Sequence, residues 1–131
     1  PLDVEGRIIA YRKRAGGLVW FDFAVLCGGP RSYADYVDLA RRFHTVILSG
    51  VPTMSPKNAD AARRFTWLVD VFYDDRVKMI VSAEAQADDL FVGQDDARGE
   101  VKTAAAEFQR TASRLQEMQS VAYLQAERTR R

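Results

Sequence analysis

Two short apolar runs that enclose an amphipathic stretch constrain this chain more than any other feature. The first run, HTVILSGVP, begins at His44 and has a continuous Val46–Leu48 centre, which is typical of a strand covered on both faces. Between residues 58 and 74 apolar side chains recur at helical spacing, and the second run, VKMIVSA, follows. Residues 44–83 therefore have the length of a right-handed parallel crossover, and they predict an α/β fold.

The segments around this β-α-β unit predict a hairpin and further helices. The runs RIIAYRKR and LVWFDF flank a turn at Ala15–Gly17, so residues 6–23 predict a β-hairpin. Ser32 stands at an N-cap position, which predicts a helix of about three turns behind it. The stretch QADDLF predicts a short helix, and residues 103–126 predict a longer one with a single apolar stripe.

Composition divides the chain into three parts. Residues 1–91 carry the hairpin and the β-α-β unit, and residues 103–131 carry the C-terminal helix and a basic tail. Between them, residues 92–102 are acidic and glycine-bearing without apolar periodicity, which predicts a flexible linker. Because the chain opens on Pro1 rather than methionine and a strand-like run starts at once, we expect it to be a piece of a longer protein.

The overall charge argues against a dedicated nucleic-acid binder. Lys and Arg number 19 against 18 Asp and Glu, although both ends of the chain are basic. The single cysteine, Cys27, excludes an internal disulfide and fits a reducing compartment. No apolar run approaches the roughly 18 residues that a membrane span needs. These features predict a cytoplasmic protein without a transmembrane segment.

The visible chain contains no complete catalytic motif. Cys27 and His44 are alone of their kind and have no partner at ligand spacing, so we expect no metal site. We interpret Cys27 as a buried thiol and His44 as a cap or a core residue. The patterns GxSxG, HExxH, GxGxxG and GxxxxGK[ST] are all absent from the sequence.

Two serines are candidates for binding because of their place on the predicted strands. Ser49 and Ser82 stand near the carboxyl ends of the two parallel strands, where open α/β sheets bind their ligands. A hydroxyl group there can orient water or a phosphate oxygen. It can equally serve the turn that follows the strand.

Arginine pairs are the candidates for anion binding, because guanidinium groups bind phosphate oxygens bidentately. The candidates for phosphate sensing are Arg114, Arg110, Arg63 and Arg64. The alternative is ordinary ion pairing within or near the helices. In that case Arg114 would pair with Glu117 and Arg110 with Glu107, while Arg63 and Arg64 would pair with Asp60 and Glu84.

Three stretches of the chain resemble a known family. They read GGLVWFDFAVLCGGPRSYADYVDLARRFHTVILSGVP, AARRFTWLVDVFYDDRVKMIVSAEA and FQRTASRLQEMQSVAYL, and together with their surroundings they cover nearly all of residues 6–124. In order and spacing they resemble the C-terminal half of the ZapE (AFG-type) family of AAA+-related P-loop ATPases. The resemblance implies a larger P-loop ATPase fold, of which this chain is the C-terminal α/β part.

The same resemblance implies ATP and Mg²⁺ as cofactors of the full-length protein. The Walker A and Walker B segments of the family precede the region seen here, so we expect residues 1–131 alone to bind no cofactor and to be inactive. It also implies that an arginine of the C-terminal part reaches the γ-phosphate, with Arg114 favoured over Arg110 because it lies further into its helix. The implied partners are the N-terminal P-loop half, cell-division proteins and further copies of the protein.

Two other functions remain open at this point. A nucleotide-free adaptor would keep the fold as a protein-binding module without a P-loop half. A nucleic-acid module would use the basic ends of the chain and would show binding that depends steeply on salt.

Overall fold

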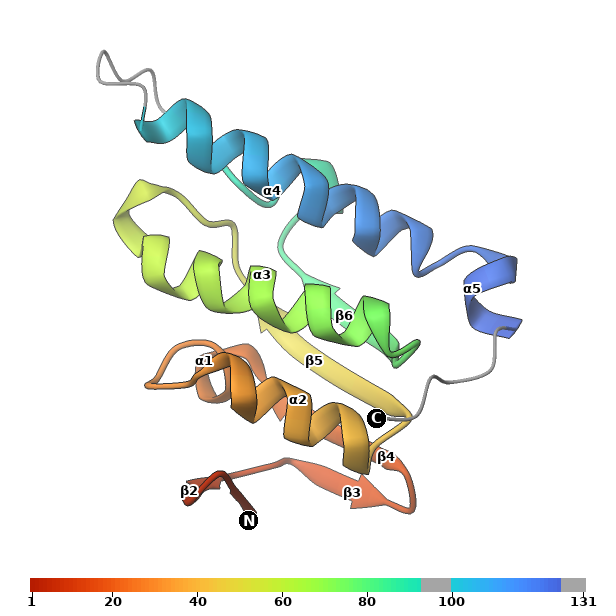
Figure 1. Cartoon of the computed structure of the whole chain (residues 1–131). Coiled ribbons are helices and arrows are strands. Elements are labelled where there is room, and N and C mark those ends of the chain that lie inside the picture. Colours follow the sequence, from red (N-terminus) through yellow and green to blue (C-terminus); the bar gives the residue numbers. More distant parts are fainter. Residues whose placement is uncertain (93–99, 126–131) are drawn as a thin grey trace.

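The computed structural model describes residues 1–92 and 100–125, and it contains a mixed α/β arrangement (Figure 1). In chain order the elements are β1 (Leu2–Val4), β2 (Arg7–Ile9), β3 (Lys13–Ala15), β4 (Leu18–Asp22), α1 (Phe23–Leu26), α2 (Tyr33–Arg42), β5 (Thr45–Val51), η1 (Pro56–Asn58), α3 (Ala59–Asp74), β6 (Lys78–Ala83), η2 (Ala87–Asp89), α4 (Glu100–Glu117) and α5 (Val121–Gln125).

The main sheet has four strands in the order β3-β4-β5-β6. Strands β4, β5 and β6 are parallel, and α3 makes the crossover from β5 to β6, which agrees with the predicted β-α-β unit. Strand β3 pairs antiparallel with β4 across a turn in which Gly16 has a φ of +57°, as the predicted hairpin requires. The run RIIAYRKR is not one strand, however, because β2 leaves the hairpin and pairs with β1 in a separate sheet.

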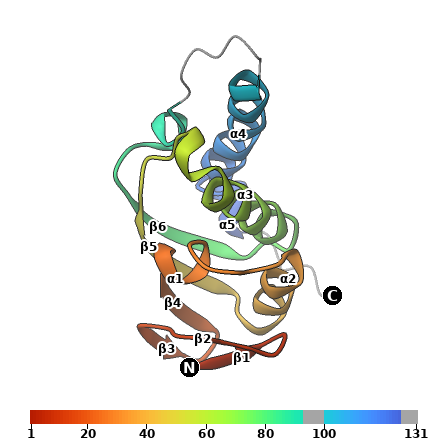
Figure 2. The same ribbon diagram turned by 90° about the vertical axis from the view of Figure 1, so that its left-hand side faces the viewer.

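The helices lie on one side of the four-stranded sheet (Figure 2). Successive side chains of a strand point to opposite faces, and the helix-covered face carries the fully buried Val19 and Phe21 of β4 and Val46 and Leu48 of β5. Apolar side chains from the inner stripes of the helices complete this core, among them Tyr36, Leu39, Phe65, Leu68 and Phe72. The amphipathic spacing seen in the sequence therefore decides which side of each helix meets the sheet.

The expectation that β5 and β6 are covered on both faces is wrong for the described structure. In β5 burial alternates along the strand, and in β6 Ile80 is 56% exposed. The reason is that every described helix that packs on the sheet lies on the same side of it (Figure 2). A continuous apolar run hides this asymmetry, because Ile47 belongs to the uncovered face and its neighbours to the covered one.

The C-terminal helix is interrupted rather than continuous. Helix α4 ends at Glu117, a turn follows, and Ser120 Oγ then accepts a hydrogen bond from Tyr123 N at 3.2 Å as α5 begins. The short helix expected at QADDLF is the 3₁₀ turn η2. Of the linker expected at residues 92–102, residues 93–99 lie outside the described part, and α4 begins at Glu100. The basic tail at 126–131 lies outside it as well.

Candidate functional site

Helices α3 and α4 lie side by side and run in the same direction (Figures 1 and 2). Midway along them Thr111 Oγ1 donates a hydrogen bond to Thr66 Oγ1 at 3.2 Å. One turn further on, Arg114 forms an ion pair with Asp70. Rings of the two helices also meet, since Phe65 and Phe108 stack with centroids 6.1 Å apart. The candidate arginines of α4 therefore belong to a helix that is firmly packed on α3.

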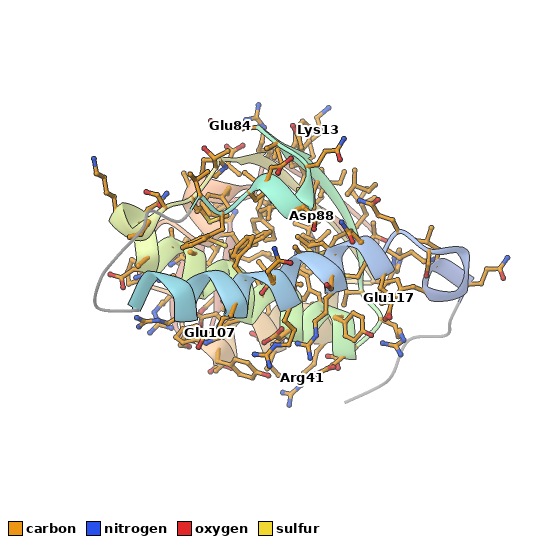
Figure 3. All side chains as sticks on the ribbon, turned by 90° about the horizontal axis from the view of Figure 1, so that it is seen from above. Lys13, Arg41, Glu84, Asp88, Glu107 and Glu117 are labelled. Carbon is orange, nitrogen blue, oxygen red and sulfur yellow. The ribbon has the colours of Figure 1, made fainter. Side chains whose placement is uncertain are left out.

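Arg114 is held on two sides. Besides its ion pair with Asp70, its guanidinium lies 5.3 Å from the centre of the Tyr73 ring, close enough for a cation–π interaction. The expected pairing of Arg114 with Glu117 is wrong, because the Glu117 carboxylate instead accepts a hydrogen bond from the Tyr73 hydroxyl. This bond raises the pKa of Tyr73, since the neighbouring carboxylate disfavours a phenolate. Figure 3 shows Glu107 and Glu117 along α4.

The other candidate arginines lie in different settings. Arg110 is exposed, and it forms no ion pair with any residue that the structure describes. Arg63 is exposed too and lies 4.0 Å from Asp60, as the ion-pair alternative expects. Arg64 is half-buried and donates to the Cys27 carbonyl oxygen at 3.2 Å. Arg63, Arg64 and Arg114 thus each contact a different partner, and Arg110 is the member of the α4 pair without an ion pair among the described residues.

A polar network occupies the carboxyl ends of β4 and β5. Trp20 Nε1 donates to Ser49 Oγ at 2.9 Å, and Ser49 Oγ donates in turn to Asp22 Oδ1 at 2.9 Å. Arg12 donates to both carboxylate oxygens of Asp22 at 3.0 and 3.2 Å, and it lies over the Trp20 ring at 4.8 Å. The candidate Ser82 is exposed near the end of the neighbouring strand β6 and has no part in this network.

The charges of this network balance one another. The hydrogen bond from Ser49, followed by that from Arg12, lowers the pKa of Asp22. Asp22 is therefore ionised at neutral pH and neutralises Arg12, which leaves little attraction for a phosphate. The base beside Ser49 is the Asp22 carboxylate, which Arg12 neutralises, whereas His44 precedes the first residue of β5, about five residues or ~16 Å away along the strand. The network can orient its members, but it is not built for nucleophilic attack.

Cys27 is a buried thiol, as the sequence predicts. Burial raises its pKa to about 12, so it stays protonated at neutral pH and is a poor nucleophile. The Tyr36 hydroxyl lies 4.0 Å from its sulfur and donates to the Leu26 carbonyl oxygen at 2.9 Å. In the described part of the chain, no three His, Cys, Asp or Glu side chains are placed to hold a metal ion.

Sequence reasoning missed the buried ion pair of Asp35. Asp35 is fully buried, accepts from the Ser32 backbone N–H at 2.8 Å, and pairs with Arg7 at 2.9 and 3.0 Å. This pair ties the β1-β2 hairpin to the start of α2. The spacing Ser32-x-x-Asp35 is a capping-box signal that was available in the sequence, whereas the partner Arg7 is 28 residues away and is brought there only by the fold.

Comparison with known proteins shows which family the chain resembles. A family model described as AFG1-like ATPase matches residues 1–127. The chain is 46% identical over 126 residues to the "Cell division protein ZapE" of Escherichia coli K12, which covers 96% of this chain and 32% of that protein. It is 35% identical to the "Lactation elevated protein 1 homolog B" of Danio rerio over an alignment of 146 residues, covering 93% of this chain and 29% of that protein.

The chain thus spans about a third of the length of these relatives. No solved structure matches it significantly. Within the described residues, every helix is too short or too polar to span a bilayer.

Proposed function

The chain belongs to the AFG1-like ATPase family, and we propose that it forms the C-terminal portion of an ATP-hydrolysing protein. The observation that carries this proposal is the match of the family model to residues 1–127. The residues of this chain do not fit ATP and Mg²⁺ by themselves, because the sequence has no GxxxxGK[ST] and the described part has no acidic cluster for a metal. The nucleotide would be held by another portion of the full-length protein.

In this proposal the chain contributes positive charge from α4. Arg110 is the candidate to offer its guanidinium to a phosphate oxygen, because it is exposed and has no ion pair with a described residue. Arg114 is the candidate to hold α4 in position through Asp70 and Tyr73. Arg63, also exposed on the neighbouring helix, and Arg64 remain further candidates for contact with a phosphate.

The cellular setting follows from the bacterial relative. That relative is a cell-division protein by name, and we propose a role of the same kind for the full-length protein, in the cytoplasm and in contact with division proteins and further copies of itself. The adaptor alternative would keep these contacts without any use of ATP.

The test is ATP turnover by the full-length protein. Arg110→Ala should lower kcat by about tenfold or more, because an arginine that meets the transferring phosphoryl group stabilises its developing charge. Arg41→Ala, which removes an exposed arginine from α2, is the matched control and should leave kcat unchanged.

Each outcome of this test decides between the alternatives. If the unaltered full-length protein neither binds nor hydrolyses ATP, the ATPase proposal fails and the adaptor takes its place. If the protein is active and the Arg110 variant keeps full turnover, Arg110 has no role at the phosphate.

A further inference from the structure

The four-stranded sheet has one face without helices in the described part of the chain (Figure 2). We call it the open face, and it comprises Leu18, Trp20 and Asp22 of β4, Thr45, Ile47 and Ser49 of β5, and Lys78, Ile80 and Ser82 of β6. Lys13 of β3 and Glu84, which follows β6, project near its two edges, on the side of the molecule away from Arg41 (Figure 3).

The centre of the open face is an apolar row across three strands. Trp20 is the register partner of Ile47, and Ile47 is the register partner of Ile80, so the three side chains stand next to one another. Trp20 and Ile47 are partly exposed, and Ile80 is 56% exposed. A row of this kind leaves apolar area in contact with water, which costs free energy unless another part covers it.

The parallel direction of the strands is a second reason to expect that the open face is covered. An antiparallel sheet commonly leaves one face in water, but parallel sheets are covered on both faces almost without exception. Strands β4, β5 and β6 are parallel, and only one of their faces is covered by described helices. In parallel folds the cover comes from the same chain, because the crossover segments that join the strands pack on the sheet.

We infer that the open face is the surface on which the nucleotide-binding portion of the same polypeptide packs. This inference rests on the proposed function, and it fits the length of the relatives, of which this chain accounts for 32% and 29%. The apolar row would be the buried centre of that contact. Beside this centre, the polar atoms of Trp20, Ser49 and Asp22 would stay satisfied, because their hydrogen bonds are made within this chain.

Thiol labelling of the full-length protein tests the inference. Ile80→Cys places a thiol on the open face at the β6 end of the apolar row, and Ile8→Cys places one on β2, where the native side chain is 67% exposed. The two sites have similar exposure within this chain, so any difference in the full-length protein reports cover by another part. Peptide mass spectrometry follows each site separately, and the buried native Cys27 serves as the unreactive reference.

We expect the thiol at position 80 to react with a maleimide at least tenfold more slowly than the thiol at position 8, and both to react equally in denaturant. Equal rates in the folded protein would overturn the inference. The readout does not involve ATP turnover, so a failure here is distinct from a failure of the proposed function.

The identity of the cover is tested by a photo-cross-link. The amino acid p-benzoylphenylalanine at position 80 should join the open face to peptides outside residues 1–131. In a mixture of ¹⁵N-labelled and unlabelled full-length protein, these cross-links should stay within one isotope. Cross-links between isotopes would assign the face to a second copy and overturn the inference.

Discussion

Arg114 of α4 forms an ion pair with Asp70 of α3, and its guanidinium lies over the ring of Tyr73, three residues further along the same helix, at 5.3 Å from the ring centre. This contact joins the last long helix to the helix of the β-α-β unit. The two arginines of α4 therefore differ in their surroundings. Arg110 is exposed and has no ion pair among the described residues. Among the described residues, one arginine of the pair is thus held by α3 and the other has no ion-pair partner.

The first prediction concerns this ion pair. Arg114→Ala should lower the free energy of unfolding by about 1 kcal/mol, because the pair is partly shielded from water and the cation–π contact is lost with it. Urea unfolding measures the loss, and a double-mutant cycle with Asp70→Ala isolates the pair. Arg110→Ala is the control and should change stability by less than about 0.5 kcal/mol. Equal losses for the two arginine variants would contradict the assignment.

The second prediction compares two arginine–aspartate pairs. Removing Arg7 in Arg7→Ala leaves the Asp35 carboxylate, which is 0% exposed, without its cation. We expect a loss of about 3 kcal/mol in the free energy of unfolding, near the lower end for a buried pair because the Arg7 side chain is partly exposed. Arg12→Ala removes an arginine–aspartate pair of the same kind at Asp22, whose side chain is 40% exposed, and should lower the free energy of unfolding by clearly less, because water screens the pair.

Urea unfolding of both variants measures this difference. If the Arg12 variant lost as much stability as the Arg7 variant, burial of the carboxylate would not be what decides the cost.

The third prediction is the titration of Asp22. Its pKa in the folded protein is lowered from 3.8, chiefly by the hydrogen bond from Ser49. The stabilisation is therefore present above the pKa of the unfolded chain and is lost as the pH falls through the folded pKa. Carbon-13 NMR of the carboxyl carbon follows the titration directly.

The variants Ser49→Ala and Arg12→Ala should both raise the pKa of Asp22, and Ser49→Ala should raise it more. Thr53→Ala, whose hydroxyl contacts Glu84 instead, should leave it unchanged. A shift of the same size in all three variants would refute the network as its cause.

The fourth prediction concerns Cys27. Burial raises the pKa of its thiol from 9.0 to about 12, whereas in the unfolded chain the thiol ionises near 9.0. The thiol's contribution to stability is thus complete below pH 9 and is lost as the pH rises from about 9 toward about 12. The difference in unfolding free energy between the wild type and Cys27→Ala, measured across this range, should shrink. A constant difference would show that the thiol is not shielded from water.

Several elements could be predicted from local patterns. The β5-α3-β6 unit was predictable because a helix with one apolar face between two apolar runs has few other ways to bury them. Helix α2 was predictable from Ser32, and the β3-β4 hairpin from the glycines of its turn. The split of RIIAYRKR between two sheets was not, because both halves have the composition of a strand and only pairing with β1 removes β2 from the hairpin.

The residue types of the candidate site could be predicted from the sequence, whereas most of the residues that they contact could not. The arginines and the strand-end serines could be named in advance, since their chemistry is intrinsic to the side chain. Arg63 lies near Asp60, three residues away, as helical spacing predicts. Ser49 and Arg114 instead contact Asp22 and Asp70, 27 and 44 residues away, although helical spacing pointed to Glu117 for Arg114. Local spacing carries no information about a contact that packing creates.

The sequence by itself determined the α/β class, the parallel unit at its centre, the resemblance to an ATPase family and the absence of a phosphate-binding loop, because each depends on the order and periodicity of neighbouring residues. Only the tertiary structure decided which arginine of α4 is paired within the described part of the chain, and which face of the sheet has described helices over it. The pairing of an arginine and the covering of a sheet face both depend on how the helices pack on the sheet. That packing is set by contacts between segments distant in the chain.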